Sequence, residues 1–423
     1  MIGEIIAIGN ELTSGRVLNT TSRYAARLLY GAGHEITAMT TIGDAPADIG
    51  KTLRRAVKRS EFVIVTGGLG ATSDDLTSEA AGKGLGRPVA LQPKVFDKIK
   101  ARYQHLDEAT TRSLKRLAML PAGAEILHPE GKMAGYLLVH DATPLFFLPG
   151  VPHEMEELLR NRVIPRLADW QPTGGKQVRQ RVFKVFGLGE TEINHRIGHL
   201  EKETATSIRI GYYPVFPEVH LSLAVTAVAA ALAETTLHRL AGEVQQALGD
   251  ALYGTDDDTM ASVTGQLLQI HGKILATAES CTGGLIGRKF TSVPGSSEYF
   301  AGGVIAYSND LKERFLGVDP ALLVRHGAVS PEVAKAMADN IRARSAADIG
   351  LAVTGIAGPA GGTPQKPVGT VFIGFSSQNK TIVTPCCFAG DRWQVQELAA
   401  VTALDLTRRF LLENTGPTRT TTL

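Results

Sequence analysis

The stretch ILATAESCTGGLIGRKF, at residues 274–290, shows the pattern on which the predicted fold rests. Its apolar first part is typical of a buried strand, and its paired glycines lead into a segment with helical spacing. A second strand–turn–helix sequence, EFVIVTGGLGATSDDLTSEA, lies at residues 61–80. Strands that alternate with helices predict parallel βαβ units, with helices on both faces of the sheet. We therefore expect an α/β protein.

Turn-rich segments divide the 423-residue chain into three expected domains, a number that its length supports. The predicted boundaries are a glycine-rich segment at residues 171–176 and an acidic one at residues 253–260. The domains are then expected at residues 1–170, 177–255 and 259–415. Strands and helices alternate in the first and third domains. The order βαββα in the second predicts a small ferredoxin-like α+β module.

The composition is that of a globular protein, with 43% hydrophobic and 20% charged residues. The net charge of +2, without a run of lysine or arginine, argues against a nucleic-acid partner. No apolar stretch is long enough to cross a bilayer, so no membrane partner is expected. The cysteines, Cys281, Cys386 and Cys387, fit neither a metal site nor a disulfide framework. We expect a cytoplasmic protein.

Two nucleophilic side chains, Ser280 and Cys281, lie at the end of the predicted strand at residues 273–280. A nucleophile at the start of a helix benefits from the helix dipole and from free N–H groups that hold an oxyanion. A cysteine would need a histidine as its base, for which His271 and His326 are the candidates. In the alternative, structural interpretation, Ser280 is a helix N-cap and Cys281 an apolar filler.

A serine needs a general base more than a cysteine does, because the pKa of its hydroxyl lies far above 7. A lysine whose pKa is lowered can serve as that base. The segment GGVIAYSNDLKERF supplies a strand, then Tyr307, then Lys312. The alternative for Lys312 is a solvated surface lysine.

The turn TGGLG ends a strand of the first domain, where the N–H groups of Gly67, Gly68 and Gly70 can point at an anion. Carboxylates follow this and other strand ends, namely Glu11, Asp44, Asp74, Asp75 and Glu79. Parallel strand ends meet at one edge of a sheet, so a divalent cation or a general base is indicated beside a phosphate. In the simpler interpretation, the glycines only form a turn and Asp74 caps the next helix.

The first domain resembles the N-terminal domain of the CinA (competence/damage-inducible protein) family in GNELTSGRV, TGGLGATSDDLTSEA and LPGVPHEM. The resemblance implies a three-layer α/β fold similar to molybdopterin-binding proteins. It also implies ADP-ribose pyrophosphatase activity that depends on a divalent metal (Mg, Mn or Co). The implied phosphate- and nucleotide-binding residues are Gly67, Gly68, Gly70, Asp44, Asp75 and Gly150, and the implied metal ligands are Glu11, Asp44 and Asp75.

The first domain also departs from the family pattern. Its departures are at Asn10, Asn19, Thr21 and Ala71. Some of these replace a charge or a rigid turn residue, and fewer carboxylates are expected to weaken a metal site.

The third domain resembles the C-terminal domain of the same family, which also occurs alone as a nicotinamide-nucleotide amidase. The shared motifs include ESCTGG, AYSNDLK, VTGIAGPAGGTPQKPVGTV and FAGDR. The resemblance implies hydrolysis of nicotinamide mononucleotide (NMN) to nicotinate mononucleotide and ammonia, without a cofactor. It implies Ser280 as the nucleophile, Lys312 as the base and Tyr307 as a group between them. The implied substrate-binding residues are Thr282, Gly283, Thr354, Gly355, Gly358 and Arg392.

The leading hypothesis is a bifunctional enzyme of pyridine-nucleotide salvage, with NMN and ADP-ribose as its small-molecule substrates. In the alternative hypothesis, the first domain is a non-catalytic nucleotide- or pterin-binding module, and the chain is a partner protein in competence or DNA repair. The resemblance also implies a homodimer.

Overall fold

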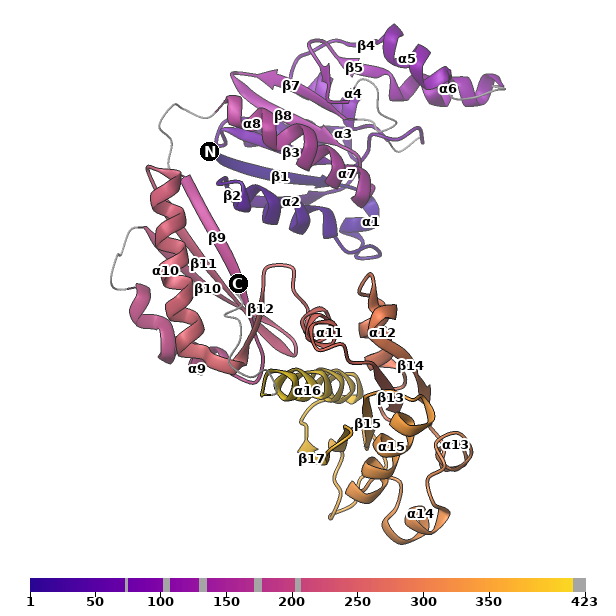
Figure 1. Cartoon of the computed structure of the whole chain (residues 1–423). Coiled ribbons are helices and arrows are strands. Elements are labelled where there is room, and N and C mark those ends of the chain that lie inside the picture. The colour runs from indigo at the N-terminus through magenta and orange to yellow at the C-terminus, as the bar shows by residue number, and fades with distance from the viewer. Residues whose placement is uncertain (73–74, 102–106, 129–134, 171–176, 202–206, 414–423) are drawn as a thin grey trace. The chain divides into compact units, whose positions relative to one another are not determined.

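The computed structural model describes residues 1–72, 75–101, 107–128, 135–170, 177–201 and 207–413 (Figure 1). They form two compact units. The first comprises Met1–Arg179 with Val225–Thr235, and the second comprises Gln180–Ala224 with Thr236–Leu423. Asp74, the predicted boundary at 171–176 and the chain beyond residue 413 lie outside the described residues.

The main sheet of the first unit has the strand order β2-β1-β3-β8-β7-β6. Parallel pairing, as expected from the alternation of strands and helices, joins β1 (Ile2–Ile8), β2 (Glu35–Ile42), β3 (Phe62–Thr66) and β8 (Thr143–Leu148). Antiparallel pairing adds β7 (Tyr136–His140) and β6 (Glu125–Ile126) at one edge. The parallel arrangement does not extend to this edge, because a tight turn at Asp141 and Ala142 joins β7 directly to β8. Both turn residues have positive φ, +48° and +65°, and an alanine gives no sequence signal for such a turn.

Helices cover both faces of this sheet, giving the expected three layers (Figure 1). One face carries α3 (Pro46–Val57) and α4 (Thr77–Gly84). The other face carries α2 (Thr20–Gly31), α7 (Pro152–Leu158), the π-helical η1 (Leu159–Val163) and α8 (Ile164–Asp169). The connections contain α1 (Asn10–Thr13), β4 (Val89–Leu91), α5 (Pro93–Lys100), α6 (Glu108–Leu117) and β5 (Met119–Pro121).

The middle module has a sheet with the strand order β10-β11-β9-β12. Its elements are β9 (Gln177–Val185), α9 (Glu190–Ile197), η2 (Gly198–Glu201), β10 (Ile208–Val215), β11 (Glu218–Ala227), α10 (Ala230–Leu248), η3 (Gly249–Ala251) and β12 (Leu252–Thr255). The succession βαββαβ agrees with a ferredoxin-like module and adds one strand to the predicted order. That strand, β12, lies in the segment expected to be only a boundary, and it pairs antiparallel with β9.

The sheet of the C-terminal domain has the strand order β14-β13-β15-β16-β17. Parallel pairing joins β13 (Leu275–Glu279) to β14 (Phe300–Ile305) and β15 (Ile349–Gly355). Antiparallel pairing adds β16 (Thr370–Ser376) and β17 (Thr381–Cys387). The carboxyl ends of the three parallel strands therefore meet at one edge, which is where α/β sheets bind ligands.

Helices also cover both faces of the C-terminal sheet. The core on one face includes residues of α11 (Met260–Ile270), α12 (Leu285–Thr291) and α16 (Arg392–Glu413). The core on the other face includes residues of α13 (Asn309–Arg314), α14 (Pro320–His326) and α15 (Pro331–Arg344), and η4 (Ser296–Glu298) precedes β14. The predicted cap of α15 is confirmed, since the Ser330 hydroxyl accepts from the backbone N–H of Val333 at 3.3 Å.

The middle module and the C-terminal domain share one hydrophobic core. Phe186 and Tyr253 of the module belong to the same buried cluster as Met260, Phe290 and many residues of α16. Polar contacts reinforce this packing, because Arg408 of α16 donates to the carbonyl oxygen of Asp250 at 2.6 Å. The second unit is compact across the boundary predicted between these two parts.

Candidate active sites

The side chains of Ser280 and Lys312 meet at the carboxyl edge of the C-terminal sheet. Ser280 directly follows β13, and Lys312 lies on α13 beyond β14. Lys312 Nζ lies 3.0 Å from Ser280 Oγ. Both residues are buried, with 8% of Ser280 and 1% of Lys312 exposed. The structure thus brings together the residues predicted as nucleophile and base.

Lys312 Nζ contacts three oxygen atoms. Nζ donates to the carbonyl oxygens of Ala306 at 2.8 Å and Tyr307 at 3.3 Å, and the Ser280 hydroxyl is its third contact. A neutral lysine has two N–H donors for the carbonyls and one lone pair for the serine proton. Within the described part of the chain, no carboxylate pairs with Lys312, and burial lowers the pKa of its ammonium group. The group is therefore suited to accept a proton.

Glu279 fixes the turn that presents Ser280. Its buried carboxylate accepts hydrogen bonds from the backbone N–H groups of Gly284, Ile286 and Gly287, at 3.0, 3.1 and 2.8 Å. Gly283 and Gly284 have φ angles of +63° and +95°, which are strained for other residues. The carboxylate therefore occupies the donors that open α12.

Two backbone donors of the same turn remain available. Among the described residues, the N–H groups of Cys281 and Thr282 make no hydrogen bond to another residue, whereas Ser280 N–H donates to the Val353 carbonyl at 2.9 Å and Gly283 N–H to the Ser280 carbonyl at 3.1 Å. The Thr282 hydroxyl is buried and has no hydrogen-bond partner in the part of the chain that the structure describes. These three groups are candidates to hold an oxyanion beside Ser280.

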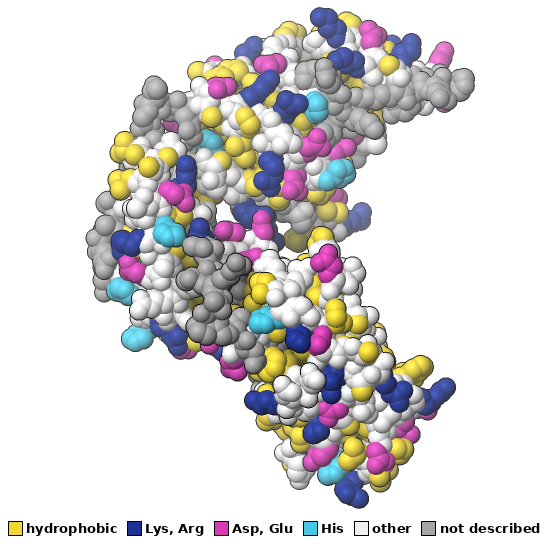
Figure 2. Space-filling model, viewed as in Figure 1, with side chains coloured by type: hydrophobic (Ala, Val, Ile, Leu, Met, Phe, Trp, Pro, Cys, Tyr) yellow, Lys and Arg dark blue, Asp and Glu magenta, His cyan; other side chains and the backbone are white. Residues whose placement is uncertain are grey.

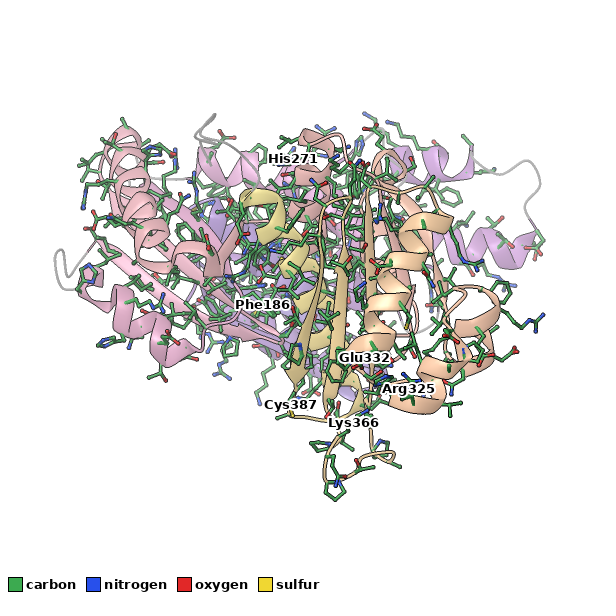
Figure 3. All side chains as sticks on the ribbon, turned by 60° about the horizontal axis from the view of Figure 1, so that its bottom comes forward. Phe186, His271, Arg325, Glu332, Lys366 and Cys387 are labelled. Carbon is green, nitrogen blue, oxygen red and sulfur yellow. The ribbon has the colours of Figure 1, made fainter. Side chains whose placement is uncertain are left out.

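The geometry disfavours Cys281 as the nucleophile. The thiol is buried, and burial raises its pKa to about 12. His271 follows α11, before β13 begins, and the five residues of β13 span roughly 16 Å. Figure 3 places His271 at the end of the domain opposite Lys366. His326 instead lies beside Glu332, with 3.4 Å between Nδ1 and Oε1.

Arg392, at the start of α16, makes hydrogen bonds to two other predicted site residues. Its guanidinium donates to the Gly358 carbonyl at 2.7 Å and to the Tyr307 hydroxyl at 2.8 Å. The Tyr307 hydroxyl therefore does not lie between Ser280 and Lys312, which contact each other directly. Tyr307 reaches Lys312 only through its backbone carbonyl, and its side chain is 58% exposed.

Two further predicted substrate-binding residues, Thr354 and Gly355, lie at the end of β15. Thr354 donates its hydroxyl to the Ala328 carbonyl at 2.8 Å. Lys366, for which no role is predicted, donates to the carbonyls of His326 and Val329 at 3.0 and 2.6 Å (Figure 3). Thr354 and Lys366 therefore brace the segment at residues 326–330.

Two site residues are absent from the sequence prediction. In the sequence, Glu279 is recognisable only as the residue before the nucleophile. Its role as a hydrogen-bond acceptor depends on the following turn, whose N–H groups fold back onto its carboxylate. Gln396 donates to the Cys281 carbonyl at 2.7 Å. The sequence could have indicated Gln396 by its spacing, because a residue four positions after Arg392 lies on the same face of a helix.

A cleft of about 1040 Å³ lies at the carboxyl edge of the first unit's sheet. Gly67 and Gly68 have φ angles of +99° and +64°, and a Cβ on Gly67 would lie 2.2 Å from the Ile8 carbonyl oxygen. The loop thus approaches β1 as only glycine allows. The residues that the resemblance implies for this domain all line the cleft, namely Glu11, Asp44, Gly67, Gly68, Gly70, Asp75 and Gly150.

The described carboxylates of this cleft do not form a closed metal cage. Asp44 accepts from the Asn10 N–H at 2.9 Å, and Asp75 accepts from the Thr72 N–H at 2.8 Å. Among the described residues, which exclude Asp74, no group of three or more His, Cys, Asp or Glu is arranged to hold a metal. Mg²⁺ is commonly held by one or two carboxylates together with substrate phosphates. The residues therefore fit a metal shared with a bound phosphate.

Figure 2 shows side chains of both charge signs interspersed over the face in view. No helix within the described ranges combines the length and the apolar character needed to span a bilayer.

Three family models match successive parts of the chain. A "Probable molybdopterin binding domain" matches residues 4–169, a "Damage-inducible protein CinA KH domain" matches residues 180–254, and a "CinA C-terminal domain" matches residues 257–411. The predicted fold class, with a molybdopterin-binding-like first domain, is therefore confirmed.

Full-length relatives carry related names. A "CinA-like protein" of Desulfotalea psychrophila is 49% identical over 411 residues, which cover 97% of this chain and 99% of the relative. A "Putative competence-damage inducible protein" of Caldanaerobacter subterraneus subsp. tengcongensis is 36% identical over 416 residues, 97% of this chain and 98% of the relative. A crystal structure of competence damage-inducible protein A from Klebsiella pneumoniae has 32% sequence identity and a TM-score of 0.36. The match covers 37% of this chain and 100% of the Klebsiella chain.

Proposed function

The chain belongs to the CinA family, and we propose that its C-terminal domain hydrolyses the amide of NMN to give nicotinate mononucleotide and ammonia. The observation that carries this proposal is the 3.0 Å contact between Ser280 Oγ and the buried amine of Lys312. A base with a lowered pKa can activate a neighbouring hydroxyl as the nucleophile of an acyl transfer. The resemblance to stand-alone nicotinamide-nucleotide amidases selects the substrate.

The proposed reaction has two halves. Ser280 Oγ attacks the amide carbon while neutral Lys312 accepts the hydroxyl proton, and the N–H groups of Cys281 and Thr282 hold the resulting oxyanion. Lys312 then gives its proton to the departing nitrogen, which leaves as ammonia. Water then attacks the acyl ester while Lys312 accepts a proton from it, and Lys312 returns that proton to Ser280 Oγ as the acid leaves. The sum is amide plus water to acid plus ammonia.

We assign Arg392 to binding the nucleotide phosphate, because other groups can hold the oxyanion. The turn after Ser280 supplies donors for the oxyanion, and Arg392 is an exposed residue at the start of α16. Its guanidinium has five N–H donors, and two of them donate to Gly358 and Tyr307. The test of the amidase proposal is ammonia release from NMN by the full chain and by variants at Ser280 and Lys312.

We also propose that the first domain hydrolyses ADP-ribose with a divalent metal such as Mg, Mn or Co. The cleft at Gly67–Gly68 with its flanking carboxylates supports this proposal. Glu11, Asp44 and Asp75 would hold the metal, which when bound neutralises phosphate charge. AMP release from ADP-ribose, with and without metal, tests the activity. Specific ligand binding without turnover would instead favour a nucleotide- or pterin-binding module and a role as a partner in competence or DNA repair.

We propose that the chain acts in the cytoplasm as a homodimer and binds no nucleic acid directly. KH domains hold nucleic-acid backbone with a GXXG loop. Residues 177–255 contain no two glycines at that spacing. Static light scattering tests the dimer, and a gel shift with single-stranded RNA and DNA tests the absence of binding.

A further inference from the structure

We infer that the middle module supports the amidase site, with Phe216 acting as a positioning residue for Arg392 through Trp393. The inference rests on the proposed amidase function. Phe216 follows β10 at the turn of the β10–β11 hairpin, and Trp393 is the second residue of α16. Their ring centroids lie 5.3 Å apart with an interplanar angle of 39°. The two rings come from different domains, so this contact links the module to α16.

The module holds its hairpin on a fixed base. Phe186 and Tyr253 are buried in the core of the C-terminal domain, and Arg408 binds the module's Asp250 carbonyl at 2.6 Å. Most of the module, including Phe216, lies in the same compact unit as the C-terminal domain. The hairpin is therefore anchored to the structure that it contacts.

The first turn of α16 serves the amidase site directly. Arg392 contacts Tyr307 and Gly358, and Gln396, on the same face, contacts the carbonyl of Cys281. Trp393 lies one residue on, roughly 100° around the helix. A contact that restrains Trp393 restrains the backbone of Arg392 too.

The ring contact leaves much of both side chains accessible. Phe216 is 41% exposed and Trp393 is 56% exposed. The pair therefore adds little to the buried core, and its loss should not unfold the domain. Its expected effect is on how well Arg392 is placed for the nucleotide phosphate, which is a specificity effect.

The test uses the full chain with Trp170→Phe, which leaves Trp393 as the chain's one tryptophan. In this background Phe216→Ala is compared with Phe216→Tyr, which keeps the ring, and with Tyr213→Ala, which removes another exposed aromatic ring from β10. Trp393 emission is recorded, and kcat and KM are measured for NMN and for nicotinamide riboside, which lacks the phosphate.

We expect Phe216→Ala to shift Trp393 emission to longer wavelength and to raise the KM for NMN about two- to tenfold, the range of an aromatic pair. The KM for the riboside should stay unchanged, and Phe216→Tyr and Tyr213→Ala should behave like the parent. An unshifted emission, an unchanged KM for NMN, or an equal loss with both substrates would overturn the inference. If the parent releases no ammonia from NMN, the proposed function itself fails and the inference falls with it.

Discussion

Lys312 Nζ and Ser280 Oγ lie 3.0 Å apart at the carboxyl edge of the C-terminal sheet, and both side chains are buried. The lysine's two other contacts are the backbone carbonyls of Ala306 and Tyr307. This arrangement holds the amine close to its serine and leaves it without a counter-charge among the described residues. Burial lowers the pKa of the Lys312 ammonium group, and it therefore makes this side chain better suited to act as a base.

Lys312→Met should remove the base while keeping a side chain of similar length. We expect kcat for ammonia release from NMN to fall about 10²- to 10⁴-fold, the range for general base catalysis. The matched control is Lys335→Met, at an exposed lysine of α15 that pairs with Asp339. An active Lys312→Met protein would remove Lys312 from the mechanism.

The pH profile should report the pKa of Lys312. Its ammonium form cannot accept the serine proton, so kcat/KM for NMN should rise with pH and level off above that pKa. Because burial lowers the pKa, the rise should lie below the value of about 10.4 found for free lysine. A profile that still rises with a midpoint near that free value would show that Lys312 stays an ordinary ammonium group.

Glu279→Gln should loosen the nucleophile turn. The substitution keeps the shape but replaces a carboxylate that accepts three N–H bonds with a group that has one acceptor oxygen. Hydrogen bonds to charged groups contribute about 1.5–3 kcal/mol, so the free energy of unfolding should fall by about that amount. Urea unfolding measures it, with the exposed Glu298→Gln as control. Equal stability of the two variants would contradict the role of Glu279.

The two proposed activities should separate on metal removal. EDTA should abolish AMP release from ADP-ribose and leave ammonia release from NMN intact in the same sample. Asp75→Asn should lower AMP release at least about tenfold, because the variant loses one charge beside the phosphate. Full pyrophosphatase activity of Asp75→Asn, or its persistence in EDTA, would refute the proposed metal site.

Local signals explain which parts of the fold could be predicted. The strand and glycine turn around Ser280 are contiguous in sequence, and so is the Ser330 cap. The extra strand β12 is short, with four residues in an acidic segment that looks like a linker. The β7–β8 turn carries Ala142, which gives no turn signal.

The site divides in the same way. The motifs around Ser280 and Lys312 favoured a serine–lysine pair over a cysteine and a histidine, but their contact depends on pairing between β13 and β14. The sequence does not show that Tyr307 turns its hydroxyl to Arg392, or that Phe216 reaches Trp393 from another domain. Such contacts are set by tertiary packing between segments far apart in the chain.

The most direct test of the account is ammonia release from NMN by Ser280→Ala and Cys281→Ala, measured side by side with the unmodified chain. The two residues are neighbours on one turn, so each variant controls for disturbance by the other. We predict that Ser280→Ala loses at least about 10³-fold in kcat, as for other nucleophile deletions, and that Cys281→Ala keeps most of it. Activity that survives in Ser280→Ala and disappears in Cys281→Ala would contradict the account and identify the thiol as the nucleophile.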